Sequence, residues 1–185
     1  MFIDTSQFEF TARLESGWRD ILQEMEDLES RELIPWPERH LYGQGWDAFG
    51  FYLLGERFDD NCARCPKTTR LLDSIPGLRS AGFSVLQPGA RIEPHIGYSH
   101  ALYVGHLALI VPEKCGIRVG RETYHWTPGR FMAFNDMIEH EAWNDDITRR
   151  VVLLIEFLRP GKTEVDLAMS PELAEALQQG AGKRQ

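Results

Sequence analysis

The stretch ALYVGHLALIVP, residues 101–112, is an apolar run bounded by turn residues, and it is far shorter than the ~20 apolar residues of a membrane span. From residue 82 onward, similar short runs recur at close spacing along the chain. They are FSVLQPG (83–89), GIRVG (116–120), TYHW (123–126), RFMAF (130–134), HEAWN (140–144) and RRVVLLIEFL (149–158). Strands of about four to ten residues at such spacing are typical of an antiparallel sandwich or barrel. The sequence therefore predicts a mainly β fold with a jelly-roll core and flanking helices.

Turn residues separate these runs in the way that hairpins require. Pro-Gly pairs stand at 88–89 and 128–129, where tight turns would join neighbouring strands. The segment RVGRETYHWTPGRFMAFN, residues 118–135, is expected to form consecutive hairpins.

The rest of the chain has a different pattern. Residues 8–28 predict one helix or two, because apolar side chains recur at spacings of three and four. CPKTTRLLDSIPGL (65–78) predicts a short helix stopped by Pro76 and Gly77, and IPWPERHLYGQGW (34–46) is broken by prolines and glycines and should be irregular. A C-terminal helix is expected over 170–180, from Ser170 and Pro171 to Gly180. We therefore expect a single domain over 1–185, with a helical N-terminal part (1–80) and a jelly-roll core over about 81–160.

The amino-acid composition limits the classes of molecule that the protein is expected to bind. The 185 residues carry a net charge of −8, which disfavours nucleic acid and anionic membranes because the long-range field has the wrong sign. A small-molecule, amino-acid or peptide substrate, possibly carrier-bound, fits this charge better. The N-terminus MFIDTSQFEF lacks the basic start and apolar core of a signal peptide, so a soluble, cytoplasmic protein is expected.

The three cysteines are an odd number, which fits a reducing compartment better than a disulfide framework. Cys62 and Cys65 form a C-x-x-C pair, but a structural zinc site would need a second pair at similar spacing. Cys115 stands alone and His40 is isolated, so free thiols in a loop are the simpler interpretation.

Two histidines and an arginine point to a metal site. His95 follows Pro94 at the end of a predicted strand, and His140 lies several strands later. In a rolled antiparallel sheet such residues can meet at the open end of the barrel, where cofactors bind. Arg150 begins the last strong strand, and its planar guanidinium suits a carboxylate. The set suggests non-haem iron with a cosubstrate carboxylate held by arginine.

The carboxylate that usually completes such an iron site is missing. It normally stands two residues after the first histidine, and that position here is Gly97. Glu93, two residues before His95, is an alternative ligand, although Pro94 and the reversed chain direction disfavour its geometry.

Several motifs of the chain resemble those of one protein family and occur in the same order. They are FSVLQPGARIEPHIG, HLALIVP, CGIRVG and EHEAWND with a following arginine. The chain is similar, from about Trp46 through Pro160, to the aspartyl/asparaginyl β-hydroxylases, which are oxygenases dependent on Fe(II), 2-oxoglutarate and O₂. The resemblance implies a double-stranded β-helix of cupin-like type and hydroxylation of an unactivated carbon. It also implies iron held by two histidines only, with water in place of the carboxylate, which would explain Gly97.

The resemblance carries roles to individual residues. His95 and His140 match the family's iron ligands. Ser84 and Arg150 match the residues that bind the distal carboxylate of 2-oxoglutarate, and His106 matches the histidine near its other carboxylate. The choice of Arg150 over the adjacent Arg149 rests on the alignment with the family alone. Both faces of this strand are apolar, so the pattern of its residues does not show which arginine points into the site.

One departure concerns the substrate. The family's best-known members carry arginines two and four positions before the histidine matched by His106, and these grip the carboxylate of an acidic peptide. This sequence has Val104 and Leu102 there, which puts hydroxylation of an aspartate in a folded extracellular domain in doubt. The membrane anchor and helical repeat region that usually accompany the family are absent from this sequence. Without a membrane segment, lipid A hydroxylation is also disfavoured.

Two other functions remain open. With no carboxylate ligand, the free coordination position could accept chloride, which makes a 2-oxoglutarate-dependent halogenase an alternative. A non-catalytic cupin-like binding module is the other. His100 and His125 have no evident partner and are expected at the surface or in loops.

Overall fold

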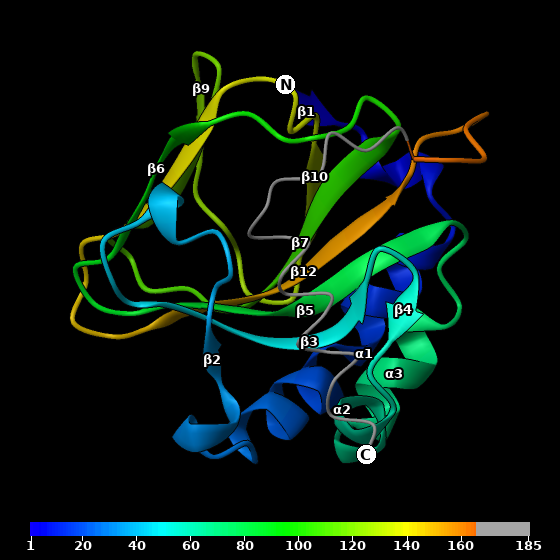
Figure 1. Cartoon of the computed structure of the whole chain (residues 1–185), viewed down its shortest axis with the longest axis horizontal. Coiled ribbons are helices and arrows are strands. Elements are labelled where there is room, and N and C mark those ends of the chain that lie inside the picture. Colours follow the sequence, from blue (N-terminus) through cyan, green and yellow to red (C-terminus); the bar gives the residue numbers. More distant parts are fainter. Residues whose placement is uncertain (166–185) are drawn as a thin grey trace.

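The computed structural model describes residues 1–165, so the helix expected over 170–180 lies outside the described residues. The described chain is mainly β and forms two antiparallel sheets (Figure 1). The larger sheet has the order β1 (Phe2–Ile3), β10 (Phe131–Phe134), β7 (Leu102–Ile110), β12 (Arg150–Leu158), β5 (Leu78–Leu86), β3 (Trp46–Leu53) and β2 (Ile34–Pro35), with β4 (Glu56–Arg57) paired to β3. The smaller sheet has the order β6 (Arg91–His95), β11 (His140–Asn144), β8 (Cys115–Val119) and β9 (Glu122–Tyr124). The predicted jelly-roll fold with flanking helices is confirmed.

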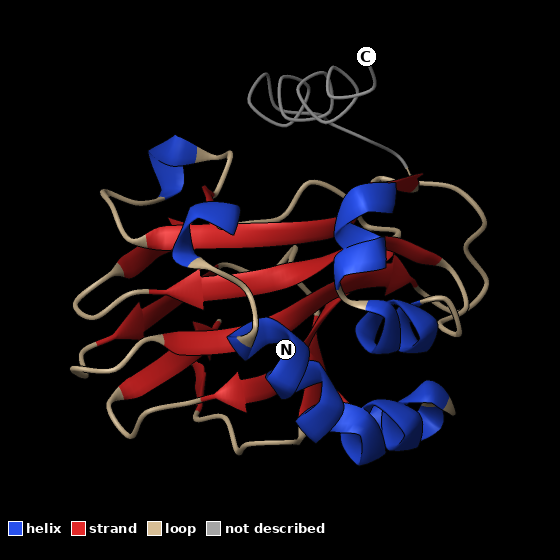
Figure 2. Ribbon diagram, turned by 90° about the horizontal axis from the view of Figure 1, so that it is seen from below, coloured by secondary structure: helices blue, strands red, loops and turns tan. Residues whose placement is uncertain are grey.

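Helices cover one face of the larger sheet, and the smaller sheet covers the other (Figures 1 and 2). Helix α1 (Phe10–Glu26) confirms the helix predicted over 8–28, and it buries Phe10, Leu14, Ile21 and Met25. Helices α2 (Asp59–Arg64) and α3 (Pro66–Leu72) follow, and α3 lies within the predicted segment 65–78. Short 3₁₀ turns occupy Thr5–Gln7, Ser30–Glu32 and Arg39–Leu41.

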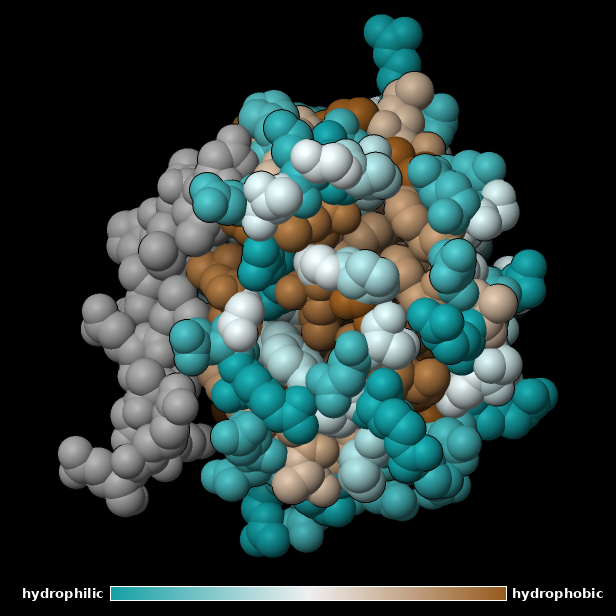
Figure 3. All heavy atoms as spheres, turned by 90° about the vertical axis from the view of Figure 1, so that its right-hand side faces the viewer, coloured by the Kyte–Doolittle hydropathy of each residue, from teal (hydrophilic) through white to brown (hydrophobic). Residues whose placement is uncertain are grey.

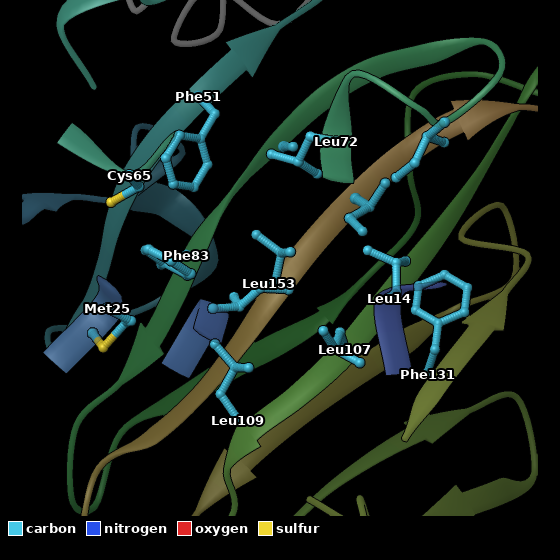
Figure 4. Packing of buried hydrophobic residues seen from close by; sticks show 14 of the residues in the cluster. Leu14, Met25, Phe51, Cys65, Leu72, Phe83, Leu107, Leu109, Phe131 and Leu153 are labelled. Atoms are coloured by element: carbon cyan, nitrogen blue, oxygen red, sulfur yellow. The ribbon is translucent and has the colours of Figure 1, made fainter. Parts of the chain in front are cut away.

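The side chains of β12 point alternately into two hydrophobic cores on opposite faces of the larger sheet. Val151, Leu153, Ile155 and Phe157 belong to the core under the helices, whereas Val152 and Leu154 belong to the core between the sheets. Figure 4 shows the first of these cores, in which Leu153 lies near Leu107 and Leu109 of β7. Because alternate residues of a strand point to opposite faces, Arg150 and Glu156 share the inter-sheet face with Val152 and Leu154.

Two expectations for the chain path were wrong. The segment 1–80, expected to be helical, also contains β3, whose Phe49 and Phe51 pack under the helices while Trp46 packs between the sheets. A strand buried on both faces lacks the alternation that identifies strands in a sequence.

The second expected hairpin is absent from the described residues: β8 pairs with β9, but β10 crosses to the larger sheet and pairs with β7 and β1. There Phe131 packs edge-on against Phe10 of α1, with ring centroids 5.8 Å apart.

The C-x-x-C pair belongs to the helical layer. Cys62 lies in α2 and Cys65 caps α2 and α3, not in a loop as expected, because Pro66 begins α3 at a position that tolerates proline. Both thiols are free and buried, and burial raises the pKa of Cys65 to about 12. Within residues 1–165 no three His, Cys, Asp or Glu side chains are grouped to hold a metal ion.

The surface is mixed in character. On the face in Figure 3, hydrophobic residues show in the middle of the view between hydrophilic side chains. Among the described helices, none is long and apolar enough to cross a membrane.

Candidate active site

His95 and His140 meet across the smaller sheet. His95 ends β6 and His140 begins β11, and the two residues are direct partners in the antiparallel register. Their ring centroids are 4.2 Å apart. The fold therefore brings together the two histidines that the sequence placed in separate segments.

The backbone orients both imidazoles in the same way. The Nδ1 atom of His95 lies 2.7 Å from the carbonyl oxygen of Glu93, and Nδ1 of His140 lies 2.9 Å from that of Ile138. A carbonyl only accepts, so each Nδ1 carries the proton and each Nε2 keeps its lone pair. Burial lowers the pKa of both rings, that of His140 to about 4, with the neighbouring His95 as the second cause. Two neutral imidazoles with basic Nε2 atoms suit a divalent metal.

Arg150 lies fully inside the protein beside Ser84. It is 1% exposed, and its Nη1 donates to the hydroxyl and carbonyl oxygens of Ser84, both at 3.3 Å. The Ser84 hydroxyl also accepts from the indole Nε1 of Trp46 at 3.0 Å, and the guanidinium lies over the ring of Trp126. Within the described residues Arg150 has no carboxylate partner and its Nε atom has no acceptor. Burial lowers its pKa to about 10, so it stays a cation at neutral pH.

The structure distinguishes the two adjacent arginines. Arg149 points to the opposite face of β12, where its Nη2 lies 3.9 Å from the sulfur of Met25. Only Arg150 lines the same pocket as the two histidines.

His106 lies on β7 within the same pocket. It is 6% exposed and packs against the rings of Trp126 and Phe134, and its Nδ1 has no partner among the described residues. Burial first, and then the charge of Arg150, lower its pKa well below the ordinary value, so the ring is neutral.

One pocket between the sheets is thus lined by His95, His140, His106, Ser84 and Arg150. The alternative ligand Glu93 is exposed, and only its backbone carbonyl contacts His95. His100 and His125 are exposed, as expected.

Asp136 occupies the space beside Gly97 and was missed in the sequence. A Cβ atom added at Gly97 would overlap the carboxylate of Asp136, and the Gly97 amide donates to the Asp136 carbonyl at 2.7 Å. Asp136 is 4% exposed and its Oδ1 has no hydrogen-bond partner in the described part of the chain. Burial and the charge of Glu156 raise its pKa to about 7. A carboxylate from another segment therefore lies beside position 97, although within residues 1–165 it does not form a three-residue metal-binding group with the two histidines.

The far part of the pocket is lined by Val104, Leu154, Glu38 and Glu156. Leu102, expected on the substrate side with Val104, is buried on the same strand but is not among the described residues that line the pocket. Glu156 was also missed in the sequence. It is the one acid in an otherwise apolar strand and lies an even number of residues from Arg150, so the sequence could have placed both side chains on the same face.

The donor set fits the iron and 2-oxoglutarate that the resemblance implies. The histidine pair presents two nitrogens to a metal. The buried Nε of Arg150 and Nδ1 of His106 lack partners within residues 1–165, and an anionic ligand with carboxylates would satisfy the arginine.

Comparisons with known proteins find relatives among hydroxylases. The sequence profile of the Aspartyl/Asparaginyl beta-hydroxylase family matches residues 15–160. The ornithine lipid ester-linked acyl 2-hydroxylase of Rhizobium tropici is 34% identical over 171 residues, and the match covers 86% of this chain and 61% of that protein. The human aspartyl/asparaginyl beta-hydroxylase is 30% identical over 169 residues, covering 86% of this chain and 22% of that protein. The chain thus spans less than two thirds of the length of these relatives.

A solved structure shares the fold. The prolyl-4-hydroxylase of Pseudomonas putida matches with a TM-score of 0.53 at 17% identity, covering 80% of this chain and 88% of that one.

Proposed function

Because the chain belongs to the aspartyl/asparaginyl β-hydroxylase family, we propose that it is an Fe(II)- and 2-oxoglutarate-dependent dioxygenase. It hydroxylates an unactivated carbon of an amino-acid, peptide or small-molecule substrate. It acts in the cytoplasm, with no nucleic-acid or membrane partner.

One observation carries this proposal. Arg150 is a fully buried cation without a carboxylate partner among residues 1–165, and it lines the same pocket as the paired histidines. An unpaired buried charge costs several kcal/mol, so its retention favours a site that an anionic ligand completes. A dicarboxylate that also binds a metal would satisfy both the arginine and the histidine pair.

Each residue has a distinct role in this proposal. His95 and His140 would hold Fe(II) through Nε2. Arg150 and Ser84 would bind the distal carboxylate of 2-oxoglutarate, and His106 would lie near its other carboxylate. When bound, iron, 2-oxoglutarate and O₂ supply an oxidation that couples formation of succinate and CO₂ to hydroxylation of a C–H bond.

The protein's own contribution is orientation and exclusion of water. Trp46 donates to the Ser84 hydroxyl, which in turn accepts from the guanidinium of Arg150 and holds it at the wall of the pocket. Phe134 and Trp126 close the space around His106 with apolar rings, which strengthens its polar contacts by lowering the local dielectric constant.

Asp136 favours hydroxylation over halogenation. A halogenase would hold chloride where the missing carboxylate ligand would be, near Gly97. The carboxylate of Asp136 lies beside Gly97, and when ionised it would repel a second anion there.

The test is a turnover assay with Fe(II), 2-oxoglutarate and ascorbate. We expect iron-dependent formation of succinate, and substrate products heavier by one oxygen atom whether or not chloride is present. A chlorinated product would identify a halogenase. Absence of both iron binding and 2-oxoglutarate consumption would overturn the proposal in favour of a binding module.

A further inference from the structure

The pocket carries three carboxylates that the proposed chemistry leaves without a counter-ion. Glu38 precedes the turn at Arg39–Leu41, Asp136 follows β10, and Glu156 lies on β12. None of the three forms an ion pair with another described residue. Three acids from separate segments therefore converge on one cavity.

A second observation points to a ligand at this cluster of acids. Asp136 is 4% exposed, it lines the pocket, and its Oδ1 has no hydrogen-bond partner among residues 1–165. A buried carboxylate oxygen without a donor costs free energy unless a ligand supplies one.

The nearest arginine is engaged elsewhere. The Nε of Arg159 donates to the carbonyl of Leu102 and its Nη2 donates to the side chain of Asn135. Its guanidinium lies over the ring of Tyr103, with the central carbon 4.6 Å from the centroid. Arg159 lowers the pKa of Asp136 through its charge but forms no salt bridge with it.

Glu156 lies toward the opposite end of β12 from the proposed cosubstrate cation. Arg150 and Glu156 are on the same face, and six residues of strand separate them by about 20 Å. Leu154 lies between them, and Val104 is the register partner of Glu156 on β7. The face thus changes from cationic at one end, through apolar, to anionic at the other.

Hydrogen bonding orients Glu156 within the pocket. The hydroxyl of Tyr98, which also lines the pocket, donates to the Oε2 atom of Glu156. This bond fixes the carboxylate but brings no positive charge. Val104 stands opposite Glu156, at a position where an arginine would have paired with it and cancelled its charge.

We propose that the substrate carries an ammonium or guanidinium group next to an alkyl portion, and that Glu156, with Asp136 and Glu38, binds this cation. The alkyl portion packs on Val104 and Leu154. This inference rests on the proposed function, because it identifies the substrate class of the same pocket.

The experiment measures binding of three probes of matched size to the protein loaded with Fe(II) and 2-oxoglutarate: hexylammonium, 1-hexanol and hexanoate. Isothermal titration calorimetry in anaerobic buffer at neutral pH gives the Kd of each. We expect hexylammonium to bind at least about 10-fold more tightly than hexanol, and hexanoate to bind most weakly, because a charge-assisted contact contributes about 1.5–3 kcal/mol.

Variants identify the carboxylate responsible. Glu156→Gln should weaken hexylammonium binding about 10-fold and leave hexanol unchanged. Glu113→Gln is the matched control, since Glu113 is exposed and does not line the pocket, and it should bind all three probes as the wild type does. Circular dichroism checks folding, and Glu38→Gln serves as the second variant if Glu156→Gln is unfolded.

The outcomes separate this inference from the proposed function. Equal affinity for hexylammonium and hexanol, or an unchanged preference in both variants, overturns the cation site. Binding of 2-oxoglutarate to the iron-loaded wild type is measured in the same series without any probe. If 2-oxoglutarate fails to bind, the proposed function fails, and the same three probes titrated into the protein supplied with Fe(II) alone still test the cation site.

Discussion

The imidazoles of His95 and His140 face each other as direct register partners of β6 and β11, with ring centroids 4.2 Å apart. Each ring is held by a carbonyl two residues earlier in its own chain segment. The pair therefore depends on strand pairing, and each ring can be removed separately without deleting the contact that orients the other.

Replacing either histidine should abolish turnover. His95→Ala and His140→Ala each remove one metal-binding nitrogen, so iron-dependent succinate formation should fall by more than about 100-fold, beyond the effect of losing an outer contact to a ligand. Fe(II) binding should weaken in parallel. His100→Ala is the control, because His100 is exposed and should leave both measurements unchanged. Substantial turnover in either ligand variant would contradict the assigned metal site.

Arg150→Met should separate stability from function. In the ligand-free protein this change removes a buried, unpaired charge, so the free energy of unfolding should rise by about 1–4 kcal/mol. The wild type should gain about 2.7 kcal/mol from 2-oxoglutarate at 100 times its Kd, and the variant should gain nothing. Denaturant unfolding with and without 2-oxoglutarate measures both effects.

Arg149→Met is the control for this prediction, because Arg149 lies on the helical face of β12 against Met25. Its response to 2-oxoglutarate should equal that of the wild type. A ligand-induced stabilisation retained by Arg150→Met would show that the carboxylate binds elsewhere.

Gly97→Ala should destabilise the protein through Asp136. The added Cβ overlaps the Asp136 carboxylate, and overpacking of this kind costs about 1–3 kcal/mol. In the double variant Gly97→Ala/Asp136→Ala the overlap disappears, so the two effects should be non-additive by at least about 0.5 kcal/mol. Gly43→Ala meets no atom within 4 Å and should be nearly neutral. Simple additivity would mean that residues 97 and 136 do not touch.

Glu156 should make stability depend on pH. Burial raises its pKa above the ordinary 4.5, while hydrogen bonds from Ser80 and Tyr98 act in the opposite direction; Asp136 and Glu38 face the same pocket. A raised folded-state pKa gives stability that is present below pH 4.5 and is lost as pH rises through the folded-state value. Glu156→Gln should therefore flatten the decline in unfolding free energy above pH 4.5. An unchanged slope, equal to that of the exposed control Glu113→Gln, would contradict this.

Much of the β core could be predicted from the sequence because its strands are short and separated by Pro-Gly turns. Strand β3 was missed because Phe49 and Trp46 are buried on opposite sides, which leaves no alternation to recognise. The path after β9 was also missed, because turn residues show where the chain bends but not which sheet the next strand joins.

Some residues of the pocket could be predicted from the sequence and others could not. His95, His140 and Arg150 could be proposed because motifs carry them, and the structure brings them into one pocket. Asp136 and Glu38 lie in irregular segments, where nothing in the sequence distinguishes an inward acid from a solvated one. Their convergence depends on the crossing of β10 to the larger sheet and on the chain before the turn at Arg39–Leu41.

The carbonyl contacts of the two imidazoles make the orientation of the histidine pair tolerant of mutation in its surroundings. Where a histidine is oriented by a neighbouring aspartate or glutamate, a single substitution of that neighbour can misdirect the ring. Here the acceptors are the backbone oxygens of Glu93 and Ile138, which no side-chain replacement removes. Substitutions around the pocket can therefore change which groups it binds without removing the contacts that orient the two imidazoles.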